Sequence, residues 1–318
     1  ADAIDRITSV THDEAAWSDC PHYTAAVIRN VTVAASPPWL VERIEAIGLR
    51  PVNNIVDITN FILHELGQPL HAFDLDRLAE RRIVVRHARA DEPFKAIDGS
   101  SHQLRSDMLV IADAEKPAAV AGVMGGIDSE VTESTKDILL EAARFDPLSV
   151  RRTARALKLS SDSSYRFERG VDPHGVLTAS QRAAQMILTL AGGHLAEGVL
   201  QTGSALPEAT HTVTMRPARC AALLGYPIDT PAMIRWLDRL NLNPRETDDR
   251  IECTIPSFRL DLHREADLIE EVARLNHYDT IHTLPRMAIR AQPEQHEVNA
   301  RQRTIQTLVS LGYHETIT

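Results

Sequence analysis

Cysteine is scarce in this sequence, and long apolar runs are absent. The chain of 318 residues has three cysteines, Cys20, Cys220 and Cys253, and none of them forms a CxxC pair. This usage argues against a cysteine zinc site and favours a reducing compartment. No stretch approaches the ~20 apolar residues of a membrane helix, and the first residues lack the basic and apolar segments of a signal peptide. We therefore expect a cytoplasmic protein with no membrane partner.

The short motifs of several enzyme classes are also missing. There is no GxSxG nucleophile elbow, no GxxxxGK[ST] phosphate loop and no HExxH zinc motif, since His64-Glu65 lacks the second histidine. If the chain is an enzyme, it works without a serine or cysteine nucleophile elbow and without a histidine-rich zinc site.

The formal net charge of −10 disfavours non-specific binding of the whole chain to nucleic acid. Residues 144–169 are the exception, with seven basic residues against three acidic ones. A local RNA-binding patch and a solvated helix face explain this island about equally well. The basic residues are Arg144, Arg151, Arg152, Arg155, Lys158, Arg166 and Arg169.

Hydrophobic periodicity predicts a mixed α+β protein of about two domains. In the first part, helices are predicted from Ser36 to Gly48, from Asp146-Pro147 and over 176–190. The run 54–63 is either a strand or a buried helix. The predicted strands are 23–33, 83–89, 107–112 and 119–126.

The stretch 202–211 has the composition of a linker. A smaller unit follows, with a helix starting at Thr230, a strand around Cys253 and a helix over 265–278. Residues 301–318 show an unfinished helix-then-strand pattern, and no initiator Met is present. We therefore expect the natural polypeptide to continue at both ends.

Several polar residues stand in apolar surroundings. Glu141 follows Ile138-Leu139-Leu140 and must be turned to water, paired with an arginine or reserved for a ligand, because an unpaired buried carboxylate is costly. The first two explanations are favoured by the residues alone. Thr59 and Asn60 interrupt an apolar run, and His71 follows a turn signature, where a histidine is more often structural than catalytic. The glycine turn 122–126 brings backbone close to a substrate or to another strand.

A second cluster is acidic. Asp267, Glu270 and Glu271 share one helix face, and Asp261 lies just upstream. Four such carboxylates suit a hard cation such as Mg²⁺. Spacing alone instead favours a solvated face in which Glu270 pairs with Arg274.

Longer segments together resemble one family, the β subunit of phenylalanyl-tRNA synthetase. Those resembling its B3/B4 editing domain are GLRPVNNIVDITNFILHELGQPLHAFDLDRL (48–78), AVAGVMGG (119–126), LLEAARFDPLSVRRTAR (139–155) and YRFERGVDP (165–173). The segment IPSFRLDLHREADLIEEVARLNHYDTI (255–281) resembles the B5 domain that follows. The resemblance covers nearly the whole chain and keeps the family's order.

The resemblance implies an α+β editing domain over 1–204. It further implies a smaller α/β B5 domain of DNA-binding-like fold over 205–288, and the start of a catalytic-like domain over 289–318. The editing pocket it implies consists of Arg50, Thr59, Asn60, His71, Gly122 and Glu141, with Ser161 and Ser163 on the far wall. In the family pattern a Thr and an Ala precede a His, whereas this chain has Ser161, Ser163 and Tyr165, so its pocket is expected to be slightly smaller or more polar.

The Mg²⁺ ligands implied by the resemblance, at the contact with the α subunit, are Asp261, Asp267, Glu270 and Glu271. The implied partners are that α subunit, in an (αβ)2 heterotetramer, and tRNA(Phe). ATP would be used by the holoenzyme but not bound by this fragment. The implied reaction is hydrolysis of mischarged Tyr-tRNA(Phe).

That reaction makes chemical sense. An apolar pocket for phenylalanine rejects an analogue with one added hydroxyl only ~10²-fold in a comparable case, so a second sieve is useful. Glu141 would accept a hydrogen bond from the phenol. His71, Thr59 and Asn60 would position the water and the ribose, and backbone N–H groups near Gly122 would stabilise the oxyanion.

Two other classes of function remain open. The fragment could be a non-enzymatic module that joins the α subunit and tRNA, or a free-standing protein that binds RNA or DNA. The acidic balance disfavours the second.

Overall fold

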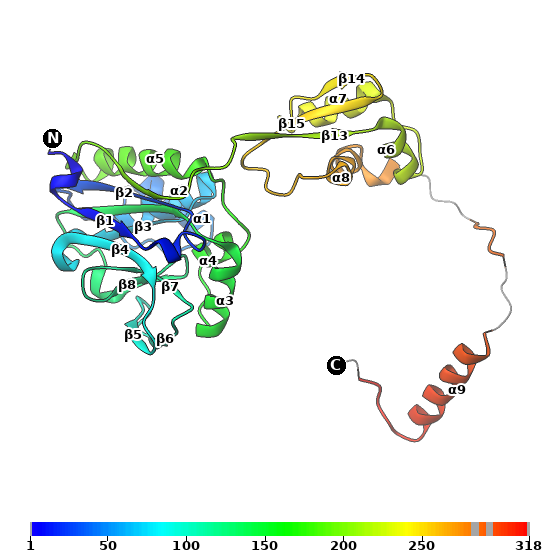
Figure 1. Ribbon diagram of the computed structural model, residues 1–318, viewed down its shortest axis with the longest axis horizontal. Helices are drawn as coiled ribbons and strands as arrows, with labels where there is room; N and C mark the ends of the chain where they lie inside the picture. The colour runs from blue at the N-terminus through cyan, green and yellow to red at the C-terminus, as the bar shows by residue number, and fades with distance from the viewer. Residues whose placement is uncertain (1, 281–285, 291–294, 317–318) are drawn as a thin grey trace. The chain divides into compact units, whose positions relative to one another are not determined.

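The computed structural model describes residues 2–280, 286–290 and 295–316. The chain divides into two units, Ala1–Leu275 and Asn276–Thr318, and each is described by itself. The mixed α and β composition expected from the sequence is confirmed (Figure 1).

Two five-stranded sheets form the body of residues 2–203. The first sheet has the order β1-β4-β7-β8-β9. β1 runs parallel to β4, and the remaining pairs are antiparallel. The strands are β1 (Ser9–His12), β4 (Arg82–His87), β7 (Leu109–Ala112), β8 (Pro117–Val120) and β9 (Met124–Gly125).

The second sheet has the order β11-β2-β10-β3, and β12 also pairs with β2. All of its pairings are antiparallel. Its central strand β10 has a strand partner on each edge, and its residues are buried on both faces of the sheet. The strands are β2 (His22–Arg29), β3 (Leu70–Asp74), β10 (Ile138–Arg144), β11 (His194–Leu195) and β12 (Leu200–Gly203).

Helices cover one face of the second sheet. α1 (Pro38–Ala46), α2 (Asn54–Leu66) and α5 (Gly175–Leu190) share a core with Ile28 and Leu140. The opposite face, which includes Val27 and Leu139, packs with residues of the first sheet such as Ile111. α3 (Pro147–Leu157) and α4 (Asp162–Phe167) add residues to this second core. The sheets therefore enclose a layer that is apolar by composition, and polar groups in it are shielded from water.

Smaller elements complete this part. β5 (Glu92–Lys95) and β6 (Ser101–Leu104) form a separate hairpin. Short 3₁₀ helices lie at Ile4–Arg6, Glu14–Ala16, Leu75–Arg77, Ala79–Arg81 and Ile127–Ser129.

Residues 210–275 have their own core. A three-stranded sheet of order β13-β15-β14 packs with helices around Met215, Leu237 and Ile269. Its elements are β13 (Thr210–Met215), α6 (Pro217–Leu224), α7 (Thr230–Asp238), β14 (Arg245–Thr247), β15 (Arg250–Pro256) and α8 (Glu265–Leu275).

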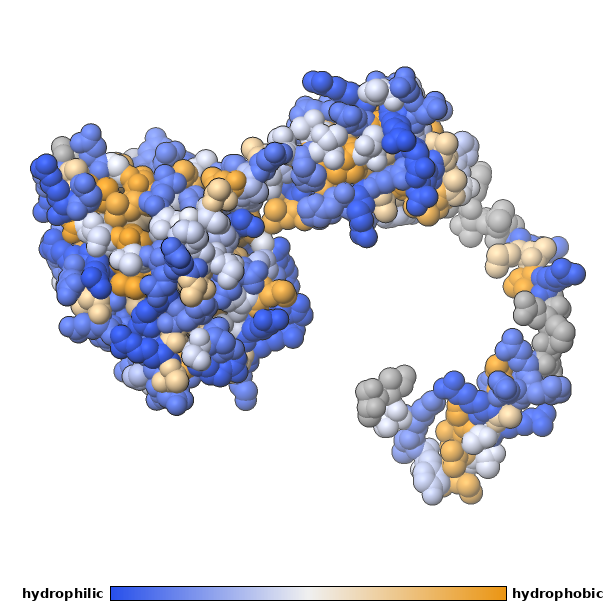
Figure 2. All heavy atoms as spheres, in the orientation of Figure 1, coloured by the Kyte–Doolittle hydropathy of each residue, from blue (hydrophilic) through white to orange (hydrophobic). Residues whose placement is uncertain are grey.

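In the second unit, a short 3₁₀ helix at Tyr278–Thr280 precedes α9 (His296–Ser310). Val298 and Val309 of α9 are exposed, and hydrophobic side chains lie uncovered along this helix in Figure 2. The strand expected after the helix is not formed within 311–316. No helix in the described ranges is long and apolar enough to span a membrane.

Several boundaries differ from the sequence-based expectation. The strand predicted over 23–33 ends at Arg29, because Asn30 adopts a left-handed φ of 57°. The predicted linker 202–211 is wrong at both ends, since its first residues pair in β12 and its last belong to β13. The helix predicted over 265–278 ends at Leu275. The ambiguous run 54–63 is helical.

The start of that helix, α2, is held by side chains. Asn53 is its N-cap and accepts hydrogen bonds from the backbone N–H groups of Ile55 and Val56 at 3.0 and 2.9 Å. Asn54, which is buried, accepts from the Ala34 N–H and donates to the Thr32 carbonyl. These bonds fix the register of α2 against the preceding loop.

Replacing the α2 cap should destabilise the protein without changing its core. Asn53→Ala removes the acceptor for two N–H groups and should lower the free energy of unfolding by ~1 kcal/mol. Urea denaturation monitored by circular dichroism would measure this. Asn53→Asp keeps an acceptor and should remain close to the wild type, and equal losses in both variants would contradict the capping role.

Candidate functional site

The central strand β10 turns one carboxylate into the layer between the sheets. Alternate residues of a strand face opposite sides. Ile138 and Leu140 belong to the core under the helices, whereas Leu139 and Ala143 belong to the core between the sheets. Glu141 therefore faces the inter-sheet layer, and it is 7% exposed. The expectation that it lies in water or in an ion pair is wrong.

His71 on β3 lies directly opposite Glu141 in the strand register. Directly opposed side chains in an antiparallel pair have Cβ atoms ~4.5–5.5 Å apart. The imidazole ring also packs edge-on against Phe73, with ring centroids 4.4 Å apart. Strand pairing thus brings together two residues that are far apart in the sequence.

These two side chains line a cavity of about 210 Å³. Thr59 and Asn60 come from α2, Gly122 from the turn after β8, and Ser161 and Ser163 from the start of α4. Seven of the eight predicted pocket residues therefore meet at one place. Arg50 does not, since it is exposed in the loop between α1 and α2 and is not among the lining residues.

Two polar atoms in this cavity are unpartnered. Glu141 Oε2 and His71 Nε2 are buried and have no hydrogen-bond partner among the described residues. The hydroxyls of two other lining residues are engaged. Thr59 donates to the Val56 carbonyl at 2.7 Å, and Ser161 donates to the Val123 carbonyl at 2.7 Å while capping α4. Among the described lining residues, the buried polar atoms without a partner thus belong to the cross-strand pair.

Burial shifts both groups toward their neutral forms. Loss of hydration raises the pKa of Glu141 to about 7, and the nearby Tyr23 hydroxyl opposes that rise. No hydrogen bond of good geometry joins the two, since the buried Tyr23 hydroxyl has no partner in the described part of the chain. Burial lowers the pKa of His71 to about 4. At neutral pH the imidazole is therefore uncharged, and the carboxyl is near its titration midpoint.

The glycine turn shapes one wall of the cavity. Gly122 has a φ of +67°, and a Cβ there would lie 2.9 Å from the Phe145 ring. At Gly125 a Cβ would lie 2.6 Å from His71 Cε1. Of the two explanations left open for this turn, close approach to another part of the chain accounts for both glycines.

Some lining residues gave no functional signal in the sequence. Val131 and Phe167 belong to apolar patterns that are typical of any core, and Glu130 is one of many surface-type acids. Tyr23 lies on the face of β2 that is turned toward the layer between the sheets, and it is fully buried beside the cavity. The sequence identifies it only as a strand residue. No local pattern distinguishes such residues, because their role comes from chain segments that meet in space.

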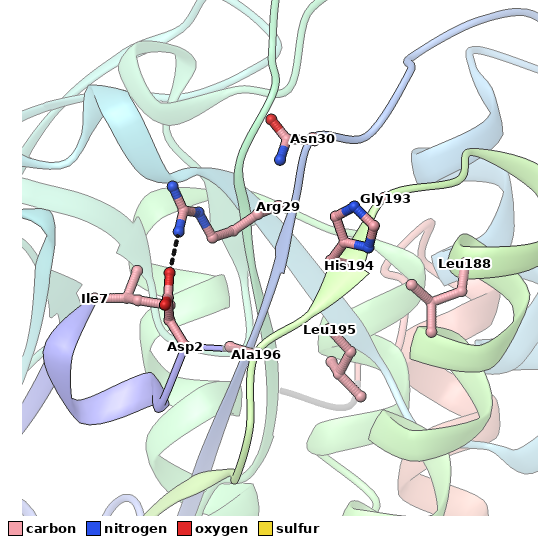
Figure 3. A pocket seen from close by; sticks show the side chains of 9 residues that line it. All are labelled: Asp2, Ile7, Arg29, Asn30, Leu188, Gly193, His194, Leu195 and Ala196. Atoms are coloured by element: carbon pink, nitrogen blue, oxygen red, sulfur yellow. Dashed lines mark hydrogen bonds and ion pairs between the residues drawn. The ribbon is translucent and has the colours of Figure 1, made fainter.

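A larger cavity, of about 690 Å³, lies elsewhere in residues 2–203 (Figure 3). None of the predicted site residues lines it. Its most prominent charged group, Arg29, already pairs with Asp2 at 2.7 Å and with Asp137 at 3.2 Å. His194 in its lining is exposed. Volume therefore does not identify the chemical site, and we place more weight on the smaller cavity with the unpartnered groups.

The predicted Mg²⁺ ligands do not converge. Arg259 donates to Asp261 at 2.7 Å and to Glu271 at 2.6 Å, and hydrogen bonding to Arg259 lowers the pKa of Asp261. Asp267 accepts from the backbone N–H groups of residues 263 and 264, and Glu270 is exposed. Within the described ranges no three such side chains are placed to hold a metal. In this structure two of the four carboxylates pair with a guanidinium, and Mg²⁺ binding by these residues stays a prediction.

The ion pair predicted for this helix, between Glu270 and Arg274, was wrong. Arg274 pairs with Glu271, not with Glu270. Arg274 pairs with the carboxylate three residues before it because Glu271 faces the protein and is 8% exposed, whereas Glu270 faces solvent.

Comparison with known proteins supports the family resemblance. Residues 19–192 match the family described as B3/4 domain, and residues 213–278 match the tRNA synthetase B5 domain. The domain limits at 204/205 and 288/289 stay predictions.

The chain is similar to curated proteins named phenylalanine–tRNA ligase β subunit. That of Salinibacter ruber is 46% identical over 99% of this chain and 38% of that protein. That of Rhodopirellula baltica is 48% identical over 99% of this chain and 46% of that protein. That of Chlorobaculum tepidum is 51% identical over 84% of this chain and 34% of that protein. The chain therefore spans less than half the length of these relatives.

One solved structure also aligns with this chain. It is an N-terminal fragment of the phenylalanyl-tRNA synthetase β-subunit from Pyrococcus horikoshii, with a TM-score of 0.39 and 13% identity, and the alignment covers 83% of this chain and 73% of that one. Likeness at this level carries no argument about fold or function.

The shifted pKa values of Glu141 and His71 predict opposite effects of pH on the stability of the protein. Glu141 has a folded pKa of about 7, above its ordinary 4.5, so its contribution to stability is complete below pH 4.5 and is lost as pH rises through 7. His71 has a folded pKa of about 4, below its ordinary 6.5, so its contribution is complete above pH 6.5 and is lost as pH falls through 4. Each pKa unit corresponds to ~1.4 kcal/mol.

Single substitutions should therefore separate the two contributions to the pH dependence of the free energy of unfolding. Relative to the wild type, Glu141→Gln should become more stable as pH rises from 4.5 to 7, by up to ~3 kcal/mol. Relative to the wild type, His71→Asn should become more stable as pH falls from 6.5 to 4. Urea unfolding across this range measures both, and pH curves that run parallel to the wild type would show that neither group is desolvated.

Proposed function

Since this chain belongs to the B3/4 domain family and resembles phenylalanine–tRNA ligase β subunits over nearly its whole length, we propose that it hydrolyses tyrosine wrongly attached to tRNA(Phe). The observation that carries the proposal is the pair of unpartnered polar atoms, Glu141 Oε2 and His71 Nε2, in one small buried cavity.

The cavity suits one amino-acid side chain. Its volume of about 210 Å³ lies below the ~300–1,000 Å³ of pockets for drug-sized ligands. Apolar lining from Leu70, Val131 and Phe167 fits an aromatic ring. Among the described lining residues, Glu141 Oε2 is the buried carboxylate oxygen that lacks a partner, and a phenol is the donor that would satisfy it.

Selectivity follows from the same carboxyl. A tyrosine hydroxyl would supply the missing hydrogen bond, whereas phenylalanine would leave the buried acceptor unsatisfied, at a cost of ~1–3 kcal/mol. The correct amino acid would thus be rejected from the cavity and the wrong one retained. Because an ionised carboxyl accepts a stronger hydrogen bond than a protonated one, the pKa near 7 makes this discrimination sensitive to pH around neutrality.

The hydrolytic step needs modest assistance, since an aminoacyl ester is already activated. With a pKa of about 4, His71 is a weak base at neutral pH, so its neutral Nε2 would orient the attacking water by hydrogen bonding. Thr59 and Asn60, adjacent residues of α2 that both line the cavity, would hold the water and the terminal ribose. The backbone N–H of Gly122 would stabilise the oxyanion, since the N–H groups of Ala121 and Val123 already donate to carbonyls. Ser163, half-buried on the opposite wall, completes the enclosure.

Several wider predictions are proposals for the complete protein. They are assembly with an α subunit as an (αβ)2 heterotetramer, binding of tRNA(Phe), ATP-dependent charging by the whole enzyme, and a cytoplasmic location. The names of the relatives, phenylalanine–tRNA ligase β subunit, support an α partner and tRNA as ligand. The match of residues 213–278 to the tRNA synthetase B5 domain is consistent with an α partner and with tRNA as ligand.

Loss of the acceptor should impair proofreading. In the complete αβ enzyme, Glu141→Ala should lower kcat/KM for deacylation of Tyr-tRNA(Phe) by about 10- to 100-fold, the value of one hydrogen bond to a charged group. Tyr-tRNA(Phe) should accumulate during charging with tyrosine. Radiolabelled deacylation assays measure both effects.

Two comparisons sharpen this test. Glu130 also lines the cavity but is only half-buried, so Glu130→Ala should have a much smaller effect. Glu141→Leu should increase hydrolysis of correctly charged Phe-tRNA(Phe), because it removes the penalty against phenylalanine. Fast Tyr-tRNA(Phe) deacylation by Glu141→Ala would refute the assignment.

For Mg²⁺, the paired carboxylates lead to a negative expectation. Titrated with MgCl₂ in a calorimeter, the chain without an α subunit should show no saturable binding at millimolar metal, because Arg259 occupies Asp261 and Glu271. Glu271 also pairs with Arg274, so Arg259→Gln combined with Arg274→Gln frees both carboxylates and should increase metal affinity. Tight binding by the wild-type chain that is lost in Asp261→Asn would show that the four carboxylates form the site unaided.

A further inference from the structure

A basic surface lies on α3 and the start of α4, and we call it the α3–α4 surface. Arg151, Arg155 and Lys158 are basic residues of it, and none of them forms an ion pair within the part of the chain that the structure describes. Val150 and Ala154 are buried on the opposite side of the helix. In a chain of net charge −10, three neighbouring cations without carboxylate partners are unusual.

An exposed aromatic ring lies within the same surface. Tyr165 on α4 is 55% exposed. The guanidinium of Arg169 stacks 3.6 Å from the ring centroid, and that of Arg166 lies 6.0 Å from it. Such stacking keeps the ring in place while much of it stays accessible. Exposed aromatic rings combined with arginines are the usual platform for bases of single-stranded nucleic acid.

The helix α4 separates this surface from the Glu141 cavity. Ser161, Ser163 and Phe167 line the cavity that contains Glu141. Their neighbours on the same short helix line a second depression of about 280 Å³, together with the end of α3. One helix, ~10 Å in diameter, therefore stands between the two sites. The residues of the second depression used below are Arg155, Lys158, Ser164, Tyr165 and Glu168.

The charges in the depression favour an anion. Its acidic lining residue, Glu168, is engaged by Arg169, which leaves Arg155 and Lys158 uncompensated. Phosphates neutralised by such cations and a base stacked on an adjacent ring are the two interactions that bind single strands without reading their sequence.

We propose that the α3–α4 surface binds the single-stranded 3′ end of the RNA whose terminal nucleotide carries the ester in the Glu141 cavity. Tyr165 stacks on a base that precedes the terminal nucleotide, and Arg155 and Lys158 neutralise the phosphates beside it. This inference rests on the proposed editing function and extends it from the amino acid to the RNA. An acidic protein surface would satisfy the cations, but its carboxylates offer no ring to stack on Tyr165.

The experiment compares two substrates in the complete αβ enzyme. One is Tyr-tRNA(Phe), and the other is the tyrosyl ester of adenosine, which fills the Glu141 cavity but has no preceding nucleotides. Tyr165→Ala should lower kcat/KM for Tyr-tRNA(Phe) by about 10- to 100-fold, mainly through KM, and should leave the adenosine ester unchanged. Tyr165→Phe keeps the ring and should behave as the wild type.

The cations are tested by their salt dependence. Arg155→Gln with Lys158→Gln should raise KM for Tyr-tRNA(Phe) and lower the slope of log KM against log salt by ~0.7 for each phosphate that the variant no longer neutralises. Arg43→Gln with Lys136→Gln removes the same charge from exposed positions that line neither cavity, and the slope should not change.

The outcomes are distinguishable. If the wild type hydrolyses neither substrate, the proposed function fails and this inference fails with it. If it hydrolyses both, but Tyr165→Ala leaves Tyr-tRNA(Phe) unaffected or impairs both esters equally, the RNA platform is refuted and the editing function stands. If Tyr165→Ala and the charge variant instead weaken assembly with the α subunit, the surface binds protein and the RNA platform is again refuted.

Discussion

A carboxyl and an imidazole held opposite each other between two sheets are the constraint on which the rest of this structure depends. Strand pairing of β10 with β3 places Glu141 against His71, and the layer between the sheets removes their water. Without ionic partners, both groups move toward their neutral forms. Burial of the apolar residues that share this layer offsets the cost.

The surroundings keep the pair apart from the rest of the polar network. Thr59 and Ser161 could compete for Glu141 or His71, but their hydroxyls donate to backbone carbonyls of α2 and of the turn at Val123. Gly125 leaves room for the imidazole ring, and a side chain there would displace it. The two buried polar atoms without protein partners are the feature of this pair on which the proposed editing role rests.

α4 connects the two ends of the proposed substrate. Its N-terminal serine is tied to the turn that forms the cavity, and its exposed face carries Tyr165 beside the cations of α3. A capping box and the bond from Ser161 to the Val123 carbonyl fix the start of α4 against this turn. The main role of Ser161 is therefore structural, and its polar character alone would not indicate this.

The sequence by itself determined a good deal about this protein. Alternation placed the strand around Cys253, and long motifs identified the family together with seven residues that meet in one cavity. It did not determine that Glu141 is buried without a counter-ion, that Arg50 stands apart, or that Arg259 holds two of the four predicted metal ligands. Those outcomes depend on distances between segments far apart in the chain. Desolvation and charge pairing act through space, so only the tertiary structure could decide them.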